Sequence, residues 1–196
     1  HHETSYDKFN ENYERIYRLE GDNYARLLQI HSDYLRDKIP EIQDIVKMAI
    51  KSPQNFFTID ENEADHSVPI QIQSITADST VFDVFTFPVI KGNPNNALNE
   101  PHTTVLTESA AKKLFDNENP IGKTIYVGNT FRSDNQYLVT GIIRDVKNSH
   151  IEIDALLSSG KYSGNTLFAT FLLLSKHADP AQVTKKINKV LKEISV

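Results

Sequence analysis

Apolar residues recur at helical spacing near both ends of the chain. Over Ser5–Tyr17 they stand three or four positions apart between charged and amide side chains, which predicts a helix. The last part of this segment, Ile16–Glu20, also alternates like a short strand, so both interpretations stay open there. Near the carboxyl end, Asp179 as N-cap and Pro180 in the first turn predict a final helix. Its buried face is expected to consist of Val183, Ile187, Val190, Leu191 and Ile194.

Between these ends the pattern changes to short alternating runs. A second helical stripe extends from Tyr24 to Leu35 and ends before Pro40, and Ile42–Ile50 is interpreted as a strand. Further strands are predicted at Phe56–Ile59, Val68–Ala77, Phe85–Ile90, Thr103–Leu106, Ile125–Val127, Tyr137–Val146 and Leu167–Leu174. One short helix, capped by Thr107, interrupts them. This layout predicts an α+β fold in which a β-rich subdomain is inserted into a discontinuous α/β subdomain.

Composition narrows the classes of protein to which the chain can belong. The chain has 196 residues, 39% of them hydrophobic and 24% charged, which is typical of a globular protein. It has no cysteine, so disulfides, thiolate metal sites and cysteine nucleophiles are excluded. The net charge of −5 argues against nucleic acid as the main partner. The longest apolar run, Leu167–Leu174, is far shorter than the roughly 20 residues that a membrane span needs.

No motif in the sequence carries recognisable chemistry. Pro120–Thr124 resembles the end of a phosphate-binding loop, but Asn117 stands where such a loop needs its first glycine, so a tight turn is the better interpretation. In His150–Asp154 three polar side chains would share one face of a strand, where a solvated face is favoured over a cation site. The Phe-rich run Val81–Phe87 is expected in the core. The sequence therefore predicts no catalytic, cofactor-binding or metal-binding residue.

Three sets of motif residues follow one another along the chain. The first set consists of Tyr6, Asp7, Phe9, Tyr17 and Arg18. The second set consists of Asp78, Phe85, Phe87 and Gly92. The third and most specific set consists of Thr107, Pro120, Gly122, Lys123, Gly141, Asp145, Ser149 and His150. In this order, and over nearly the whole chain, they resemble the MacB-like periplasmic core domain of ABC-transporter permeases of the MacB/FtsX type.

The resemblance implies a fold that agrees with the layout inferred from the pattern. The two ends of the chain, residues 5–50 and 166–196, would form a discontinuous α/β subdomain called the porter. Residues 51–165 would form the inserted β-rich subdomain called the sabre. The stretch Ser158–Asn165, rich in Ser and Gly, would be a short linker between them. Since family members return to the membrane after the final helix, the chain is expected to be an ectodomain excised from a membrane protein.

The motif residues are expected to have structural roles. Thr107 would cap a helix, Pro120 and Gly122 would form a turn, and Gly141 would let a neighbouring strand approach closely. The helix Tyr6–Tyr17 would continue a membrane helix and act as a mechanical link. None of these residues is expected to touch a transported substrate.

The resemblance also implies partners and a function. The parent permease would dimerise with a second copy and act with a cytoplasmic ABC ATPase, which binds the ATP and magnesium. The domain itself would hold no cofactor, lie on the periplasmic side of the inner membrane, and relay ATP-driven motion to a periplasmic adaptor or cargo protein. Efflux, lipoprotein release and control of cell-wall hydrolases stay open as the task of the parent protein.

Two alternatives of other classes remain. An extracytoplasmic ligand-binding or sensor domain would show a concave apolar pocket with convergent polar groups. A periplasmic hydrolase would need a catalytic constellation with a perturbed titratable group.

Overall fold

The computed structural model of the chain describes residues 10–19, 34–50, 54–58, 70–127, 136–146, 153–159 and 169–194. The described strands form one mixed sheet in the order β1-β11-β2-β5-β10-β7-β9-β8-β3-β4, with β6 paired to β9. The strands are β1 (Ile16–Leu19), β2 (Ile42–Ile50), β3 (Gln54–Thr58), β4 (Ile70–Ile72), β5 (Ser74–Ala77), β6 (Val89–Lys91), β7 (Thr103–Thr107), β8 (Thr124–Val127), β9 (Gln136–Ile143), β10 (Ala155–Ser158) and β11 (Ala169–Leu174). The helical elements are the 3-10 turn η1 (Tyr13–Arg15), α2 (Val81–Val84), α3 (Glu108–Phe115), α4 (Pro180–Ile194) and a stretch at 34–38.

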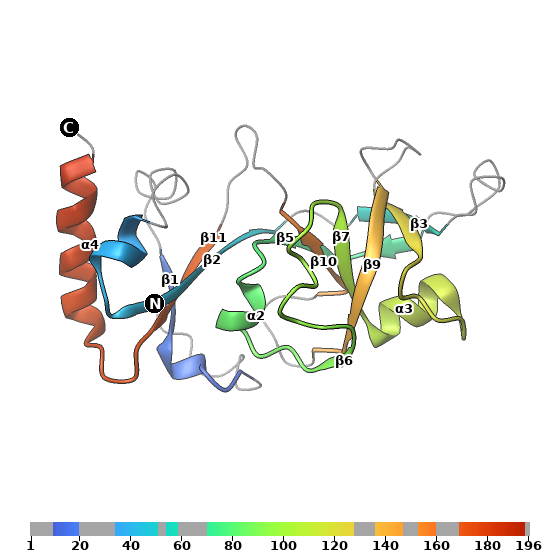
Figure 1. Cartoon of the computed structure of the whole chain (residues 1–196), viewed down its shortest axis with the longest axis horizontal. Coiled ribbons are helices and arrows are strands. Elements are labelled where there is room, and N and C mark those ends of the chain that lie inside the picture. The colour runs from blue at the N-terminus through green and yellow to red at the C-terminus, as the bar shows by residue number, and fades with distance from the viewer. Residues whose placement is uncertain are drawn as a thin grey trace.

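The sheet extends along the long axis of the molecule, with α4 at one end and α3 near the other (Figure 1). Strands from both ends of the chain lie side by side, because β11 pairs antiparallel with β1 on one side and with β2 on the other. The strand β2 then pairs with β5, which joins this end of the sheet to the strands from the middle of the chain. Two pairs, β5–β10 and β7–β9, are parallel.

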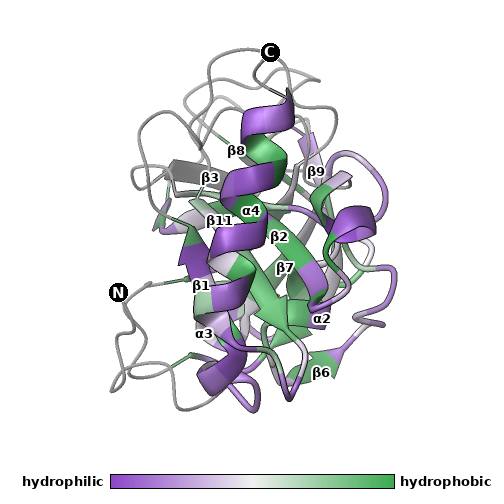
Figure 2. Ribbon diagram, turned by 90° about the vertical axis from the view of Figure 1, so that its left-hand side faces the viewer, coloured by the Kyte–Doolittle hydropathy of each residue, from purple (hydrophilic) through white to green (hydrophobic). Residues whose placement is uncertain are grey.

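Successive side chains of β11 point to opposite faces of the sheet, as strand geometry requires. Leu172 and Leu174 pack under α4 together with Val183, Ile187 and Leu191. Figure 2 shows α4 in front of the sheet with polar residues on its outer side. Its lysines Lys185, Lys186, Lys189 and Lys192 are exposed.

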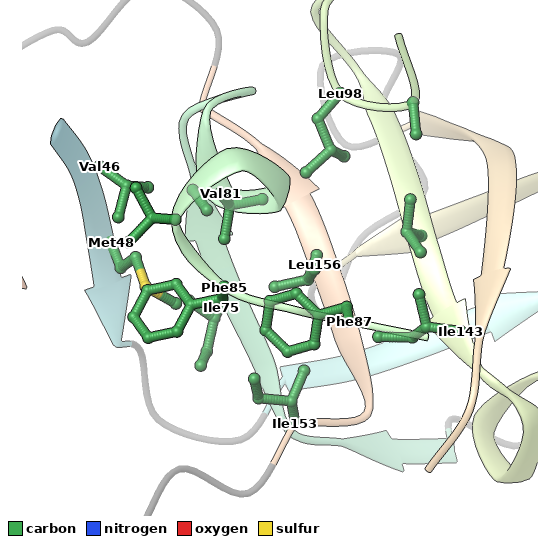
Figure 3. Close-up of a cluster of buried hydrophobic side chains, with 14 of the residues drawn as sticks. Val46, Met48, Ile75, Val81, Phe85, Phe87, Leu98, Ile143, Ile153 and Leu156 are labelled. Carbon is green, nitrogen blue, oxygen red and sulfur yellow. The ribbon is translucent and has the colours of Figure 1, made fainter. Parts of the chain in front are cut away.

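On the other face, Phe171 and Leu173 face the central core. This core contains α2 and the segment that follows it, and Phe85 and Phe87 lie in it together with Met48 of β2, Ile75 of β5 and Leu156 of β10 (Figure 3). A third cluster lies under α3 and includes Leu106, Leu114 and Ile142. Burial on both faces explains why β5, β7 and β10 are almost wholly apolar or Thr/Ser, without exposed alternate positions.

Much of the predicted layout is confirmed. The fold is α+β, and the strand Ile42–Ile50, the Thr107-capped helix and the final helix lie where the pattern placed them. The Phe-rich run Val81–Phe87 contributes to the central core as expected. The helix predicted from Tyr24 is described only over 34–38, so most of it lies outside the described residues. None of the helices in the described ranges is long and apolar enough to cross a bilayer.

The strand predicted at Phe85–Ile90 is wrong over most of its length. The helix α2 ends at Val84, and β6 begins only at Val89. Between them, the Thr86 backbone N–H donates to the Asn10 side chain and Pro88 has no N–H, so this stretch cannot form a regular ladder.

The first predicted helix is also wrong near its end. Tyr13–Arg15 forms one 3-10 turn, and Ile16–Leu19 leaves it as strand β1, the alternative that the alternation allowed. Pairing with β11 decides between the two forms. Four residues of β1 pair with this largely buried strand, and that tertiary pairing outweighs the local propensity for helix. Tyr17 therefore lies on a strand, and a helical link as far as Tyr17 does not exist.

The strand β10 was not predicted. Ser158, the first residue of the predicted linker, is its last residue. Asp154 lies just before it, where its carboxylate accepts from the Gln73 N–H at 3.0 Å. The polar strand face predicted for His150–Asp154 is therefore absent at its described end. The division into porter and sabre stays a prediction, and β2–β5 pairing makes the sheet continuous next to the proposed boundary at residue 50.

Candidate functional site

The part of the chain that the structure describes contains no group of three His, Asp or Glu side chains that could hold a metal ion. Its clearly shifted carboxyl groups have structural causes. A hydrogen bond from Lys186 lowers the pKa of Glu41, and one from Lys123 lowers the pKa of Glu118. The pair of Lys123 and Glu118 is exposed, whereas Glu41 is half-buried beside the exposed Lys186. The candidates for a functional role are instead the residues that join separate segments of the chain.

The first joint is made by the leading segment, Asn10–Arg15, which precedes β1. The Asn10 side-chain oxygen accepts a hydrogen bond from the Thr86 backbone N–H at 2.8 Å. In return, the Glu11 backbone N–H donates to the Thr86 hydroxyl at 3.2 Å. Asn10 is only 1% exposed, so this contact is buried in the protein. The leading segment is thereby fixed to the stretch between α2 and β6.

The same segment makes a second joint through Arg15. Its guanidinium donates to the Leu174 carbonyl at 2.8 Å and to the Gln43 side chain at 3.1 Å. It also donates to the Asn12 side chain, which holds the turn of the leading segment against it. Leu174 ends β11, and a short turn connects it to α4. One side chain therefore links the start of the described chain to the strand before the final helix.

Asp78 forms a third joint, at the end of β5. Its carboxylate accepts from the Lys47 backbone N–H at 3.2 Å and from the Ser159 hydroxyl at 3.1 Å. The Lys47 ammonium lies 3.9 Å from the same carboxylate. Nearby, the Thr80 hydroxyl donates to the Ile45 carbonyl at 2.8 Å. These contacts tie β2, β5 and the end of β10 together on one edge of the central core.

Gly92 and Gly141 form a close backbone crossing. Gly92 has φ +89°, and a Cβ there would lie 2.3 Å from the Thr140 carbonyl oxygen and 2.8 Å from the Gly141 Cα. A Cβ on Gly141 would lie 3.2 Å from a Val105 methyl group. The chain after β6 can therefore lie against β9 only because Gly92 lacks a side chain. At Gly141 the close neighbour is Val105 of β7, so a side chain there would need Val105 to shift by a few tenths of an ångström.

The helix α3 is closed at its N-terminus from two directions. The Thr107 side chain accepts from the Ala110 N–H at 3.2 Å, which confirms the predicted cap. Asp145, which follows β9, accepts from both the N–H and the hydroxyl of Ser109. A carboxylate at this position also interacts favourably with the helix dipole.

Pro120–Lys123 forms the predicted turn. The Lys123 N–H donates to the Pro120 carbonyl at 3.0 Å, and Gly122 has φ +82°, at the turn position where glycine is favoured. The turn is held to β9 by hydrogen bonds of the Gly122 N–H and Lys123 carbonyl with Val139. The Lys123 ammonium pairs with Glu118 and lies over the Phe115 ring. Its surroundings are a helix end and a strand, so it has no phosphate-binding geometry.

The structure thus does not gather the sequence-predicted residues into one site. Tyr17 packs beside the α4 cluster, Arg18 is exposed on β1, and Phe85 and Phe87 lie in the central core. The remaining described residues form the cap, turn, crossing and joints given above: Asp78, Gly92, Thr107, Pro120, Gly122, Lys123, Gly141 and Asp145. Five lie outside the described residues: Tyr6, Asp7, Phe9, Ser149 and His150.

Sequence reasoning missed the partners that matter most. Asn10 and Thr86 belong to no motif, and their contact spans 76 positions along the chain. Arg15 lay within the motif-bearing stretch, but a positive charge before a strand carries no signal for the carbonyl that it binds. Only the structure brings these groups together.

Comparison with known proteins agrees with this fold. The family described as the MacB-like periplasmic core domain matches residues 4–190. No functionally curated protein matches the chain significantly. A structure described as a domain of a permease protein from Porphyromonas gingivalis is 19% identical, with a TM-score of 0.67, and the match covers 82% of this chain and 74% of that one.

Two further structures are similar. The periplasmic region of MacB from Actinobacillus actinomycetemcomitans is 18% identical, with a TM-score of 0.62, over 91% of this chain and 82% of that one. The extracellular domain of the ABC-type transporter YknZ from Gram-positive bacteria is 14% identical, with a TM-score of 0.57, over 87% and 86% of the two chains. At these identities the likeness is one of fold.

Proposed function

Since the chain belongs to the family of MacB-like periplasmic core domains, we propose that it relays ATP-driven motion of an ABC-transporter permease to a partner or cargo protein in the periplasm. In this proposal the domain performs no chemistry. A cytoplasmic ATPase binds ATP and magnesium, and a second permease copy completes the dimer. The partner that receives the motion is a periplasmic adaptor or the cargo itself.

The observation that supports the proposal is the continuous sheet. Strands β1, β2 and β11, from the two ends of the chain, form one end of it. Through β2–β5 they share a hydrogen-bonded ladder with the strands from the middle of the chain. A sheet covered on both faces is stiff because packed interiors have low compressibility, so it can carry a displacement from one end to the other.

The proposal is tested in the complete permease, reconstituted with its ATPase in lipid vesicles. This segment contains no cysteine, so a single cysteine at the exposed position Lys185 of α4 gives one defined spin label per copy once any cysteines in the rest of the permease are replaced. We expect the distance between the two labels to change between the nucleotide-free and ATP-trapped states. The matched control carries the same label and is combined with an ATPase variant that binds ATP but does not change conformation on binding it.

A second label position makes the test specific for a relay. A cysteine at the exposed position Lys112 of α3 reports on the other end of the sheet. Motion at both positions supports a relay through the domain. No nucleotide-dependent change at either position would reject the proposal.

A further inference from the structure

We infer that the leading segment, Asn10–Arg15, is a two-point latch that couples the incoming chain both to the central core and to the strand before α4. The inference rests on the proposed function, because a latch has a task only in a domain that transmits motion. One point of the latch is Thr86, and the other is the Leu174 carbonyl. A displacement of the leading segment therefore acts on two places that lie far apart in sequence.

The first point of the latch resists sliding and rotation. Asn10 receives a hydrogen bond from the Thr86 backbone with its side chain, while Glu11 donates to the Thr86 side chain with its backbone. Two bonds in opposite senses between the same two stretches fix their relative position better than one. Because Asn10 is almost fully buried, water cannot substitute for a broken bond without a local opening.

From Thr86 the contact continues directly into the central core. Its neighbours Phe85 and Phe87 are both buried there. The Phe85 ring lies 5.3 Å from Phe171 of β11 in an edge-on arrangement, and the Phe87 ring lies 6.0 Å from Phe82 of α2. Aromatic contacts of this kind are directional and close-packed, so Thr86 cannot shift without moving α2 or β11.

The second point acts on the other end of β11. Arg15 binds the carbonyl of its last residue, Leu174, and the next residue, Ser175, donates to the Glu41 carbonyl before the chain turns toward α4. The guanidinium also holds Gln43 of β2. The leading segment therefore bears on β11 twice, through Phe85–Phe171 and through Arg15.

Stability alone does not explain Asn10. Its side-chain NH₂ group is buried and has no hydrogen-bond partner among the residues that the structure describes. A buried unpaired amide group is unfavourable, and such groups in native proteins call for a reason other than stability. In the latch the side-chain oxygen of Asn10 is the group that is used, since it accepts from the Thr86 N–H, and the buried position of the side chain serves this contact rather than the pairing of its NH₂ group.

Coupling between Asn10 and Thr86 is measured first on the 196-residue chain itself, with Asn10→Ala, Thr86→Val and the double variant. Thr86→Val keeps the side-chain shape but removes the acceptor for the Glu11 N–H. We expect clearly non-additive losses of unfolding free energy and faster hydrogen exchange at Phe87 and Val89 in both single variants. Asn96→Ala, at an exposed loop position, is the matched control and should change neither quantity. Additive losses would overturn the latch.

The second test uses the complete permease with its ATPase and a spin label at the exposed Asp83 of α2. In the otherwise unchanged protein the distance between the two copies' labels should change on ATP trapping. With Asn10→Ala this change should be largely lost, whereas the label at Lys185 should still respond. Full retention of the Asp83 response would reject the latch but keep the relay. No response in the unchanged protein at Asp83, Lys112 or Lys185 would reject the relay and the latch with it.

Discussion

Asp145 accepts hydrogen bonds from both the backbone N–H and the hydroxyl of Ser109, at 3.0 and 2.6 Å. The two residues belong to different elements, since Asp145 follows β9 and Ser109 lies in the first turn of α3. The carboxylate therefore satisfies a helix-end donor that the helix cannot satisfy itself, and it places negative charge at the positive end of the dipole. Asp145 thereby joins α3 to the segment that follows β9.

Replacing this carboxylate should loosen α3. For Asp145→Ala we expect a loss of about 1 kcal/mol in unfolding free energy, the size of a lost N-terminal cap. Urea denaturation followed by circular dichroism measures it. The control, Glu100→Gln, removes an exposed carboxylate that lies outside any helix. A loss no larger than that of the control would contradict the role assigned to Asp145.

The close crossing at Gly92 gives the largest expected effect. In Gly92→Ala the added Cβ would lie 2.3 Å from a backbone oxygen, in a conformation with φ +89°. Backbone cannot move aside as a side-chain end can, so we expect a loss of about 3 kcal/mol or more, or failure to fold. Differential scanning calorimetry measures the change in Tm.

Gly122→Ala is the matched control for this prediction. Gly122 also has positive φ, +82°, but a Cβ there would meet nothing within 4 Å. It should cost only the conformational strain, about 1–2 kcal/mol. Equal losses in the two variants would show that strain, and not the close approach to Thr140, dominates at Gly92.

Asp78 holds three segments, and its removal should be felt in all of them. Asp78→Ala takes away the acceptor of the Lys47 N–H and the Ser159 hydroxyl. We expect a loss of about 1–3 kcal/mol, since partly buried donors lose their partners. Asp37→Ala, on an exposed position of the helix at 34–38, should be neutral or slightly stabilising. Hydrogen exchange should also rise at both β2 and β10, and a change confined to one strand would contradict the joint.

The stability of the domain should depend on pH through Asp44. Burial and the nearby Asp83 raise the pKa of Asp44 above its usual 3.8, and Arg36 opposes this only in part. Since the folded pKa exceeds the unfolded one, this carboxyl favours folding below the usual pKa, and that contribution is lost as pH rises through the folded pKa. Asp44→Asn should therefore gain Tm relative to the unchanged protein between about pH 3 and about pH 7.

Thermal unfolding of both proteins across this range checks the prediction. The variant Asp37→Asn is the control, because Asp37 is exposed on the same helix as Arg36. A difference in Tm between Asp44→Asn and the unchanged protein that stays constant with pH would show that Asp44 has an ordinary pKa.

The parts of the fold that local rules determine could be predicted. Thr107 and Asp179 could be predicted as N-caps, because a cap interacts only with residues close to it in the sequence. The Asp179 carboxylate accepts from the Ala181 N–H at 2.9 Å. Ile42–Ile50 could be predicted because Val46, Met48 and Ile50 alternate with the period of a strand, which is a local signal.

Other parts depend on partners that are distant in sequence. The segment around Tyr17 fits either a helix or a strand, and only β11 decides between them. The stretch after Val84 is extended but unpaired because Asn10 takes the Thr86 N–H. The joints at Asn10, Arg15 and Asp78 therefore could not be predicted, since each joins segments that lie far apart in the sequence.

The position of β11 in the sheet has a consequence for how the domain is made. This strand comes late in the chain, yet it lies between β1 and β2, and Arg15 and Leu174 meet across 159 positions. In the described part of the sheet β1 has no other neighbour. During synthesis β1 therefore cannot pair in the sheet until β11 has also been synthesised. Such late closure slows folding and leaves a strand edge open to wrong pairing. The domain should therefore mature only after synthesis and export of this region are complete, and chains that end before Ala169 should be substrates for proteases.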